Sequence, residues 1–420
     1  MDHKDLARVR RCSGSIGLPG HFTDHSPDLP HFSAQASEKS PELTHRKFMS
    51  HVTAAPLIVD ESRASTTDTT FTLGHRPELD GLRGISILLV LLLHLGFSVV
   101  RGGFLGVDIF FVLSGFLITS LLVQEANTRG SISLKKFYIR RALRLGPAVA
   151  TFMLGTGIYA LLFLNHDEAR LTYQGILLTL SYVSNWVFAF NEHVKVGPLG
   201  ITWSLAIEEQ FYLLWPLLLI LLLKLKTRRR TVLLLVALAI AVTALNRKIL
   251  MEGGARIERM YYATDTRADA LLVGCLVALL LSWNVLPQHD VFRGLMKIMA
   301  ILGCFTILTL AVTTTSQDLF LYAGGFTLVS LSVGAVLIVL MLWPPALVLK
   351  ALRFGPLRWI GRVSYGLYLW HWPVREFVCP NFEAASAARL IEVTVIAFGI
   401  TALSFYLIEQ PFLKMKERFA

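Results

Sequence analysis

Ten long apolar stretches restrict what this chain can fold into more than any other feature of its sequence. Each is about the length of a helix that crosses a bilayer, and only helices and closed barrels satisfy the backbone inside lipid. A composition of 54% hydrophobic and 16% charged residues agrees, because soluble domains of this size are more polar. The sequence therefore predicts an all-α integral membrane protein with ten spans, at residues 83–100, 103–123, 146–164, 205–223, 231–246, 268–284, 295–313, 320–343, 364–381 and 389–408.

An eleventh apolar candidate, residues 174–190, decides the topology of everything after it. It is interrupted by Ser181, Ser184 and Asn185. If it crossed the membrane, the basic loop 224–230 would lie outside, against the rule that short loops rich in lysine and arginine stay in the cytoplasm. We therefore predict that 174–190 is re-entrant or interfacial and that both termini are cytoplasmic.

The two ends of the chain are predicted to be tails around one membrane domain. Residues 1–72 are polar and are expected to form a disordered cytoplasmic tail, residues 73–412 the membrane domain, and residues 413–420 a short basic cytoplasmic tail. The first tail has no apolar core typical of a secretory signal, so the first span is expected to be an uncleaved anchor. Residues 1–75 hold seven of the twelve histidines at irregular spacing, and we predict no metal site there.

The basic composition indicates membrane lipids rather than nucleic acid as partners. The formal net charge is +11, but the lysines and arginines form short clusters between the apolar stretches. Such clusters are typical of loops that face anionic lipid. The basic segment 247–267 is an exception, because it is predicted to lie outside. An acidic ligand and a simple solvated loop explain it equally well.

Arg83 and His94 are the first candidate site residues. They are eleven positions apart, so on a helix they lie about 20° apart on one face and about 16 Å apart along the axis. Both are costly in lipid and should face a protein-lined cavity. The first two spans form a predicted hairpin that turns near Arg101, which would place Asp108 opposite His94. A carboxylate that orients an imidazole prepares a general base, although the pair could also be a polar clasp between helices without chemistry.

Further candidates lie on the next predicted spans. Arg141 and Arg144 share a helical face and form a predicted anion clamp that faces the cytoplasm, unless they only set the topology. Arg140 precedes them as a possible supporting residue. Glu208 lies just inside a span, where a carboxylate needs a partner or water.

Three residues nearer the C-terminus are possible supporting residues. Arg267 and Asp269 lie at a predicted helix start, and His371 lies between two tryptophans within a span. His371 could equally be a packed histidine that is hydrogen-bonded between helices.

Seven motifs follow one another along the chain, and the first six contain the candidates other than His94. They are, in order, RPELDGLRG, GGFLGVDIFFVLSGFLI, FYIRRALRLGP, TWSLAIEEQFYLLWP, DTRADALLVG, SYGLYLWHWP and IEQPF. Each motif alone is modest. Their order and spacing over residues 76–412, with ten residues between Arg83 and His94, resemble the acyltransferase-3 family of membrane O-acyltransferases.

The resemblance implies transfer of an acyl group, often acetyl, from acyl-coenzyme A to a hydroxyl of a glycan or glycosylated small molecule. It implies the cytoplasmic (inner) membrane of a bacterium and no permanently bound cofactor. Some relatives carry an extra esterase-like domain; the sequence ends at Ala420, so we expect no step that depends on one. By motif, the essential histidine is His94, its partner arginine Arg83, the acid of the second motif Asp108, the arginine pair Arg141 and Arg144, and the acid of the Trp-Ser-Leu motif Glu208.

We therefore expect a continuous tunnel from a basic inner mouth to His94. The phosphates of coenzyme A would bind at the arginines, and His94, oriented by Asp108, would deprotonate the acceptor hydroxyl. An acyl-histidine intermediate remains an open variant. The rival class is a multi-pass transporter or flippase that uses the buried arginine, histidine and aspartate as a proton or solute pathway.

Overall fold

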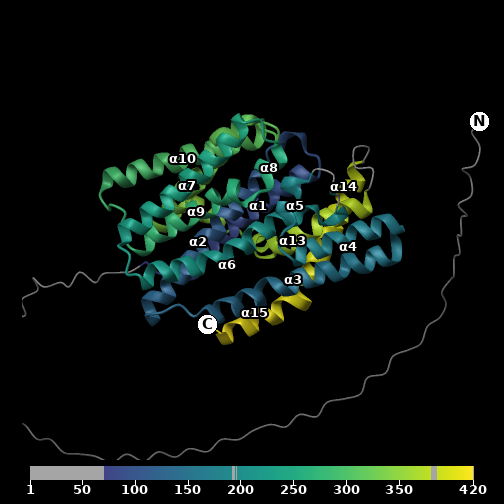
Figure 1. The fold of residues 1–420 in the computed structure, drawn as a ribbon, viewed down its shortest axis with the longest axis horizontal. Coiled ribbons are helices and arrows are strands. Elements are labelled where there is room, and N and C mark those ends of the chain that lie inside the picture. The colour runs from purple at the N-terminus through teal and green to yellow at the C-terminus, as the bar shows by residue number, and fades with distance from the viewer. Residues whose placement is uncertain (1–70, 192–193, 195, 380–385, 420) are drawn as a thin grey trace, which may run out of the picture. The chain divides into compact units, whose positions relative to one another are not determined.

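A computed structural model describes residues 71–191, 194, 196–379 and 386–419. Almost all of the predicted tail 1–72 lies outside the described residues. Thr67–Ala420 forms one compact unit, and its described residues contain helices but no strand (Figure 1). The α-helices are α1 (Pro77–His94), α2 (Leu105–Arg129), α3 (Leu134–Phe163), α4 (His166–Leu180), α5 (Ser184–Phe190), α6 (Trp203–Lys224), α7 (Arg229–Glu252), α8 (Ile257–Tyr262), α9 (Thr264–Ser282), α10 (Asp290–Thr313), α11 (Phe326–Leu342), α12 (Ala346–Leu352), α13 (Gly355–Val378), α14 (Ala387–Ser404) and α15 (Gln410–Lys416).

Seven helices among the described residues are long and apolar enough to cross a membrane. They are α2, α3, α7 and α10, together with the continuous helices that contain α6, α11 and α14. Large apolar side chains on α10 point outward, for example Ile301 and Phe305, which are 69% and 68% exposed. Such a surface is stable against acyl chains but not against water. The chain is thus an all-α membrane protein.

The other three long helices, α1, α9 and α13, carry more charged residues. Each overlaps one of the ten predicted spans, so every predicted span corresponds to a long helix. The charges that lower the hydropathy of these helices include Arg83 and Arg267. The helices that look least like membrane spans therefore supply candidate site residues.

The first helix ends earlier than the apolar pattern predicts. The stretch 83–100 was expected to continue to a turn near Arg101, but α1 ends at His94. Gly96 adopts a φ of 73°, a left-handed conformation that ends a helix, and Ser98–Val100 forms a 3-10 turn. His94 therefore lies in the last turn of α1 rather than well inside it.

The predicted interruption within 174–190 is confirmed. α4 ends at Leu180 and α5 begins at Ser184, and between them Tyr182 has a φ of 53°. The side chain of Asn185 holds α5 against α8, because its amide nitrogen donates to the carbonyl oxygen of Tyr262 at 3.2 Å and to the hydroxyl of Thr264 at 3.0 Å.

Two pairs of helices pack closely and run in the same direction. Asp108 near the start of α2 contacts Arg267 near the start of α9, and further along a Cβ on Gly274 would lie 2.0 Å from the carbonyl oxygen of Val112. On α1 and α13, a Cβ on Gly361 would lie 1.7 Å from the carbonyl oxygen of Asp80, while His94 meets His371 further along. Only glycine permits such backbone approach.

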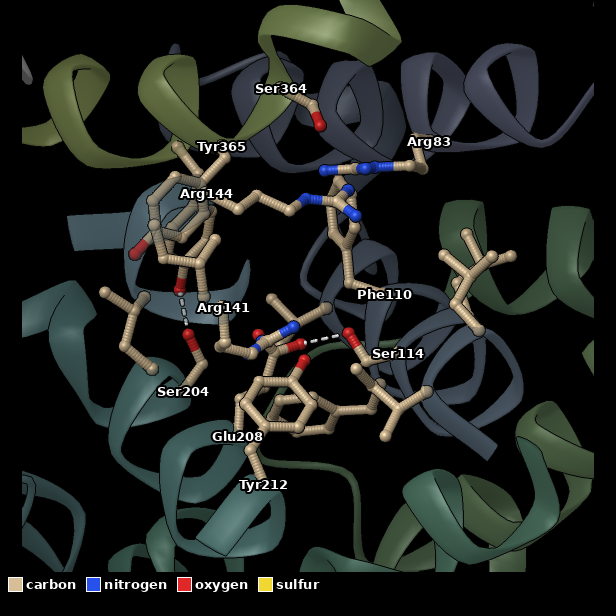
Figure 2. A pocket seen from close by; sticks show the side chains of 18 of the residues that line it. Arg83, Phe110, Ser114, Arg141, Arg144, Ser204, Glu208, Tyr212, Ser364 and Tyr365 are labelled. Atoms are coloured by element: carbon tan, nitrogen blue, oxygen red, sulfur yellow. Dashed lines mark hydrogen bonds between the residues drawn. The ribbon is translucent and has the colours of Figure 1, made fainter. Parts of the chain in front are cut away.

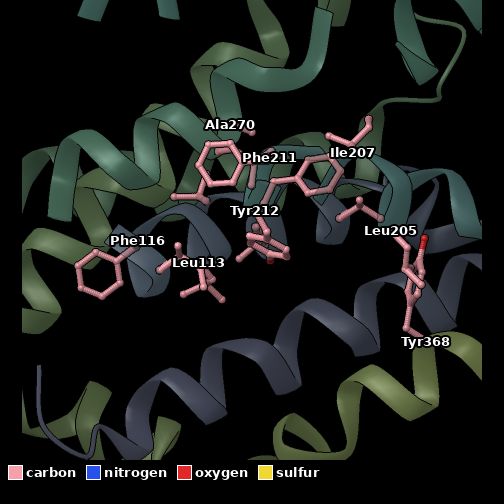
Figure 3. Close-up of a cluster of buried hydrophobic side chains, with 14 of the residues drawn as sticks. Leu113, Phe116, Leu205, Ile207, Phe211, Tyr212, Ala270 and Tyr368 are labelled. Carbon is pink, nitrogen blue, oxygen red and sulfur yellow. The ribbon is translucent and has the colours of Figure 1, made fainter. Parts of the chain in front are cut away.

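The interior of the unit is an apolar cluster where α2, α6, α9 and α13 meet. Figure 3 shows Phe116 of α2, Phe211 of α6 and Ala270 of α9 in this cluster. Trp215 of α6 is tied into it by an indole hydrogen bond to Thr119 at 2.8 Å. These contacts fix α2 and α6, the helices that carry Asp108 and Glu208.

The residues predicted as a short basic tail continue the last long helix. α15 is followed by a 3-10 turn at Glu417–Phe419, and both pack on α3. The guanidinium of Arg140 donates to the carbonyl oxygen of Phe419 at 3.0 Å, which holds this end of the chain against α3.

Candidate active site

Three arginines converge on one cavity between α1, α2, α3, α6 and α13 (Figure 2). We name it the arginine cavity. Arg83 comes from α1, and Arg141 and Arg144 come from α3, one helical turn apart. The volume is about 90 Å³. The remaining lining includes Ser114, Ser204, Glu208, Tyr212, Ser364, Tyr365 and Tyr368.

The arginine cavity has an excess of positive charge. Arg83 and Arg144 form no hydrogen bond or ion pair with any residue that the structure describes, and none of their nitrogens is sealed from open space. Arg141 is stacked over the ring of Tyr212 at 3.0 Å and lies 3.9 Å from Glu209. Glu208, the one carboxylate in the lining, accepts a hydrogen bond from Ser114 at 2.7 Å. Two unpaired guanidinium groups in one cavity favour a polyanionic ligand.

A second cavity, of about 360 Å³, adjoins the first and shares Arg141 and Arg144 with it. Its lining adds Lys416 of α15 and Arg140. Arg140, however, is paired with Glu125 at 2.8 Å. Arg140 therefore lines the adjoining cavity and not the arginine cavity, and its charge is largely neutralised.

His94 is hydrogen-bonded to His371. The Nδ1 atom of His94 lies 2.9 Å from the Nε2 atom of His371, and the two rings are stacked with centroids 5.1 Å apart. The edge of Trp372 packs on His94 with a centroid distance of 4.9 Å. Since α1 and α13 are parallel neighbours, this contact follows from their packing.

The hydrogen bonds of His371 determine which nitrogen of His94 is free. Nδ1 of His371 lies 3.0 Å from the carbonyl oxygen of Leu367, which can only accept, so Nδ1 carries the proton. In the neutral pair, Nε2 of His371 is then an acceptor, and Nδ1 of His94 must donate to it. Nε2 of His94 is left as an acceptor, and it has no partner among the described residues and is not sealed from open space. This is the form that a general base requires.

The sequence predicted that Asp108 orients His94, but in the structure it does not. Its carboxylate is buried and pairs with Arg267 of α9 at 2.9 Å. The prediction was wrong for two reasons: α1 ends at His94, and the close packing of α2 on α9 brings Arg267 opposite Asp108. The guanidinium of Arg267 is also stacked on the ring of Phe326 at 3.8 Å. This ion pair links two helices.

Asp269 belongs to a second buried ion pair that sequence reasoning missed. Arg247 of α7 binds both carboxylate oxygens of Asp269, at 3.1 Å and 2.9 Å, and Thr327 donates to one of them at 2.6 Å. Arg247 was assigned to an outer loop because it follows the apolar stretch 231–246, whereas α7 continues to Glu252 and buries it.

Carboxylates neutralise most of the basic segment 247–267. Arg259 is bidentate to Asp265 at 2.8 Å and 2.6 Å, and Lys248 lies 3.7 Å from Glu252. With Arg247 and Arg267 also paired, this segment lacks the excess positive charge that an acidic ligand would need.

Among the described residues, the arginine cavity does not extend from Arg83 to His94 as the expected continuous tunnel would. His94 is absent from the lining of the arginine cavity and faces two other cavities. Tyr368 closes the arginine cavity on this side, since its hydroxyl contacts Ser204 at 2.8 Å and its ring lies 5.7 Å from His371. Glu208 lines the arginine cavity together with the arginines. Its predicted depth had suggested a position beside His94.

A family model for an acyltransferase domain, that of the acyltransferase-3 family, matches residues 76–409. The chain belongs to this family. The resemblance drawn from the seven motifs is thereby confirmed.

The chain also matches several bacterial proteins. It is 38% identical over 351 residues to the peptidoglycan O-acetyltransferase OatA of Listeria monocytogenes, covering 80% of this chain and 56% of the relative. It is 36% identical over 350 residues to the putative peptidoglycan O-acetyltransferase YrhL of Bacillus subtilis, covering 80% and 54%. The O-acetyltransferase OatA of Staphylococcus aureus is also 36% identical, with 80% and 57% covered. The chain thus spans about half the length of these relatives. No solved structure matches it.

Proposed function

We propose that the chain is a membrane O-acyltransferase that moves an acyl group, most simply acetyl, from acyl-coenzyme A to a hydroxyl of a glycan or glycosylated acceptor. The family and the names of the relatives support acyl transfer to a sugar. The observation that carries the proposal is the pairing of a cavity with two unpaired arginines and a histidine whose acceptor nitrogen is open.

The arginine cavity is the proposed donor site. Coenzyme A carries several phosphate charges, and Arg83 and Arg144 have no competing carboxylate within ion-pair distance among the described residues. The adjoining larger cavity leaves room for the bulky nucleotide end, while the narrow arginine cavity fits an extended arm. The thioester would then pass Tyr368 to reach His94, so we infer that the contact between Tyr368 and Ser204 opens during transfer.

His94 is the proposed general base. Its Nε2 atom takes the proton from the acceptor hydroxyl, and the oxygen forms a bond to the thioester carbonyl carbon. The carbon–sulfur bond then breaks, and the coenzyme A thiolate takes the proton from the imidazolium. His371 holds His94 in the required tautomer. Asp108, Arg267 and Asp269 act at a distance by fixing α2, α7 and α9, and Glu208 balances charge in the arginine cavity.

We also propose ten spans, with both termini on the cytoplasmic side of the bacterial inner membrane. The parallel directions of α2 and α9 support this count. From the start of α2 to the start of α9 the ten-span arrangement has four crossings, α2, α3, α6 and α7, which return the chain to the same side. A crossing at 174–190 would make the number odd and would reverse α9. The parallel pair α1 and α13 gives the same result.

The proposal is tested with purified protein by measuring thiol release from acetyl-coenzyme A and acetyl transfer to a glycan. His94→Ala should lower kcat at least about 100-fold, because general base catalysis contributes at least that factor. Arg144→Gln should raise the KM for acetyl-coenzyme A about tenfold or more, as expected for a lost charge-assisted hydrogen bond.

Exposed residues of the same type serve as controls for these variants. His166→Ala and Arg293→Ala lie outside both cavities and should leave kcat and KM unchanged. Normal turnover by a folded His94→Ala protein would contradict the role of His94. An unchanged KM in Arg144→Gln would mean that the arginines only set the topology.

A further inference from the structure

His94 also lines a cavity on the side of α8, which we name the α8 cavity. Its volume is about 210 Å³. The walls come from the end of α1, the residue before α2, the short helix α8 and the loop that follows α10. They consist of Leu93, His94, Phe104, Ile257, Glu258, Tyr261, Tyr262, Ser316 and Gln317.

Several polar groups that line the α8 cavity have no partner. The carboxylate of Glu258 and the hydroxyls of Tyr261 and Tyr262 form no hydrogen bond with any described residue, and none of these atoms is sealed from open space. The Nε2 atom of His94 likewise has no partner among the described residues and is not sealed from open space. Burial raises the pKa of Tyr261 and of Tyr262, so both hydroxyls stay protonated and can donate. Convergent polar groups among apolar walls are typical of a ligand site.

The two tyrosine rings are held rigidly beside the cavity. The ring centroid of Trp203 lies 5.0 Å from that of Tyr261 and 5.3 Å from that of Tyr262. Tyr262 also packs against Phe188 at 5.6 Å. Fixed aromatic rings offer flat apolar surfaces with polar tips, which suits a ligand that has both apolar C–H faces and hydroxyl groups.

The charge of the α8 cavity is opposite to that of the arginine cavity. Glu258 is the acidic residue in its lining, which contains no lysine or arginine. The nearby Arg259 and Arg267 are neutralised by Asp265 and Asp108. A polyphosphate would be repelled here, whereas a carboxylate accepts hydrogen bonds well from neutral hydroxyl groups. The two cavities therefore suit two different substrates.

We propose that the α8 cavity binds a neutral sugar ring of the acceptor, with Glu258 and the two tyrosines holding the ring so that one hydroxyl meets Nε2 of His94. This assignment rests on the proposed function, because it makes the sugar the acyl acceptor. A further cavity of about 380 Å³ shares Glu258 and Tyr262 and is lined by Trp372, so neighbouring sugar units of a chain have room.

The test is direct binding of tri-N-acetylchitotriose and of maltotriose to the purified full chain in detergent, by calorimetry and without donor. Wild-type protein should bind at least one of these probes. Glu258→Gln and Tyr262→Phe should each weaken that binding about tenfold, as expected for a lost hydrogen bond to or from a charged or buried group. The matched control is Glu252→Gln, which lies at the end of α7 outside the cavity and should bind like wild type.

Failure of this inference is distinguishable from failure of the proposed function. If wild type binds neither sugar, or if both cavity variants bind like the control, the α8 cavity is not the acceptor site even where thioester turnover is normal. If these variants instead raise the KM for acetyl-coenzyme A, the cavity belongs to the donor and the inference is overturned. If the wild type shows no thioester turnover, the proposed function is contradicted. The sugar-binding measurements then still show whether the α8 cavity binds a sugar.

Discussion

At the scale of single residues, the chemistry of His94 depends on a partner 277 positions away. A carboxylate partner would add a negative charge to a buried imidazole pair, and burying an unpaired charge is costly. A neutral histidine fixes the same tautomer without that charge. His371 can do so because the carbonyl oxygen of Leu367 holds its own proton in place.

We expect His371→Leu to lower kcat about 10- to 100-fold with little change in either KM, since residues that orient a functional group typically contribute that much. His371→Gln should recover part of kcat, because its side-chain oxygen can accept from Nδ1 of His94. Steady-state kinetics of both variants measure this. If Leu and Gln reduce kcat equally, or change only thermal stability, His371 is a packing residue and does not orient His94.

The candidate residues could be predicted from sequence to the extent that helical spacing decides their position. Arg141 and Arg144 share a face of one helix, and they meet Arg83 as expected. The partners of His94 and Asp108 could not be predicted, because they come from α13 and α9 and depend on helix packing. The open carboxylate of Glu258 was also missed, since the charge pattern of its segment concealed which charges were paired.

At the scale of helices, glycines decide which helices touch. The Cβ that Gly274 lacks would overlap the backbone of α2, so the spacing of α2 and α9 depends on its absence. The pair of Asp108 and Arg267 lies at the same interface. The apolar stretches predicted which segments are helical. The ends of the helices and the helices that they contact depend on single residues such as Gly96, and a hydropathy value averaged over many residues does not detect these.

We expect Gly274→Ala to destabilise the protein by about 1–3 kcal/mol, the usual effect of overpacking a close interface. Gly399→Ala on α14 is the matched control, because its Cβ would meet nothing within 4 Å and alanine favours a helix. Thermal unfolding in detergent compares them. Equal melting temperatures of Gly274→Ala and wild type would show that α2 and α9 can separate without loss.

At the scale of the whole molecule, the directions of distant helices constrain the topology more tightly than hydropathy does. The sequence predicted that 174–190 is re-entrant or interfacial, and this prediction depended on the basic loops. Two parallel helix pairs, joined through glycine contacts, require an even number of crossings between their members.

This topology predicts which loops a membrane-impermeant maleimide can reach in intact spheroplasts. In a background without native cysteines, His166→Cys at the start of α4 should be labelled from outside, because α3 ends just before it after an outward crossing. Lys226→Cys between α6 and α7 should be labelled only after the membrane is permeabilised. Labelling of position 226 from outside would place a crossing at 174–190 and reverse every later helix.

The side chain of Tyr368 separates the arginine cavity from His371 and His94. A permanent passage lined by arginines and an imidazole would conduct protons and small anions down the electrochemical gradient. Because Tyr368 closes this passage, a membrane can hold many copies of the protein without losing its electrochemical gradient through them. For the transfer between the two sides of the membrane that we propose, the same protein must also keep that membrane impermeable to ions.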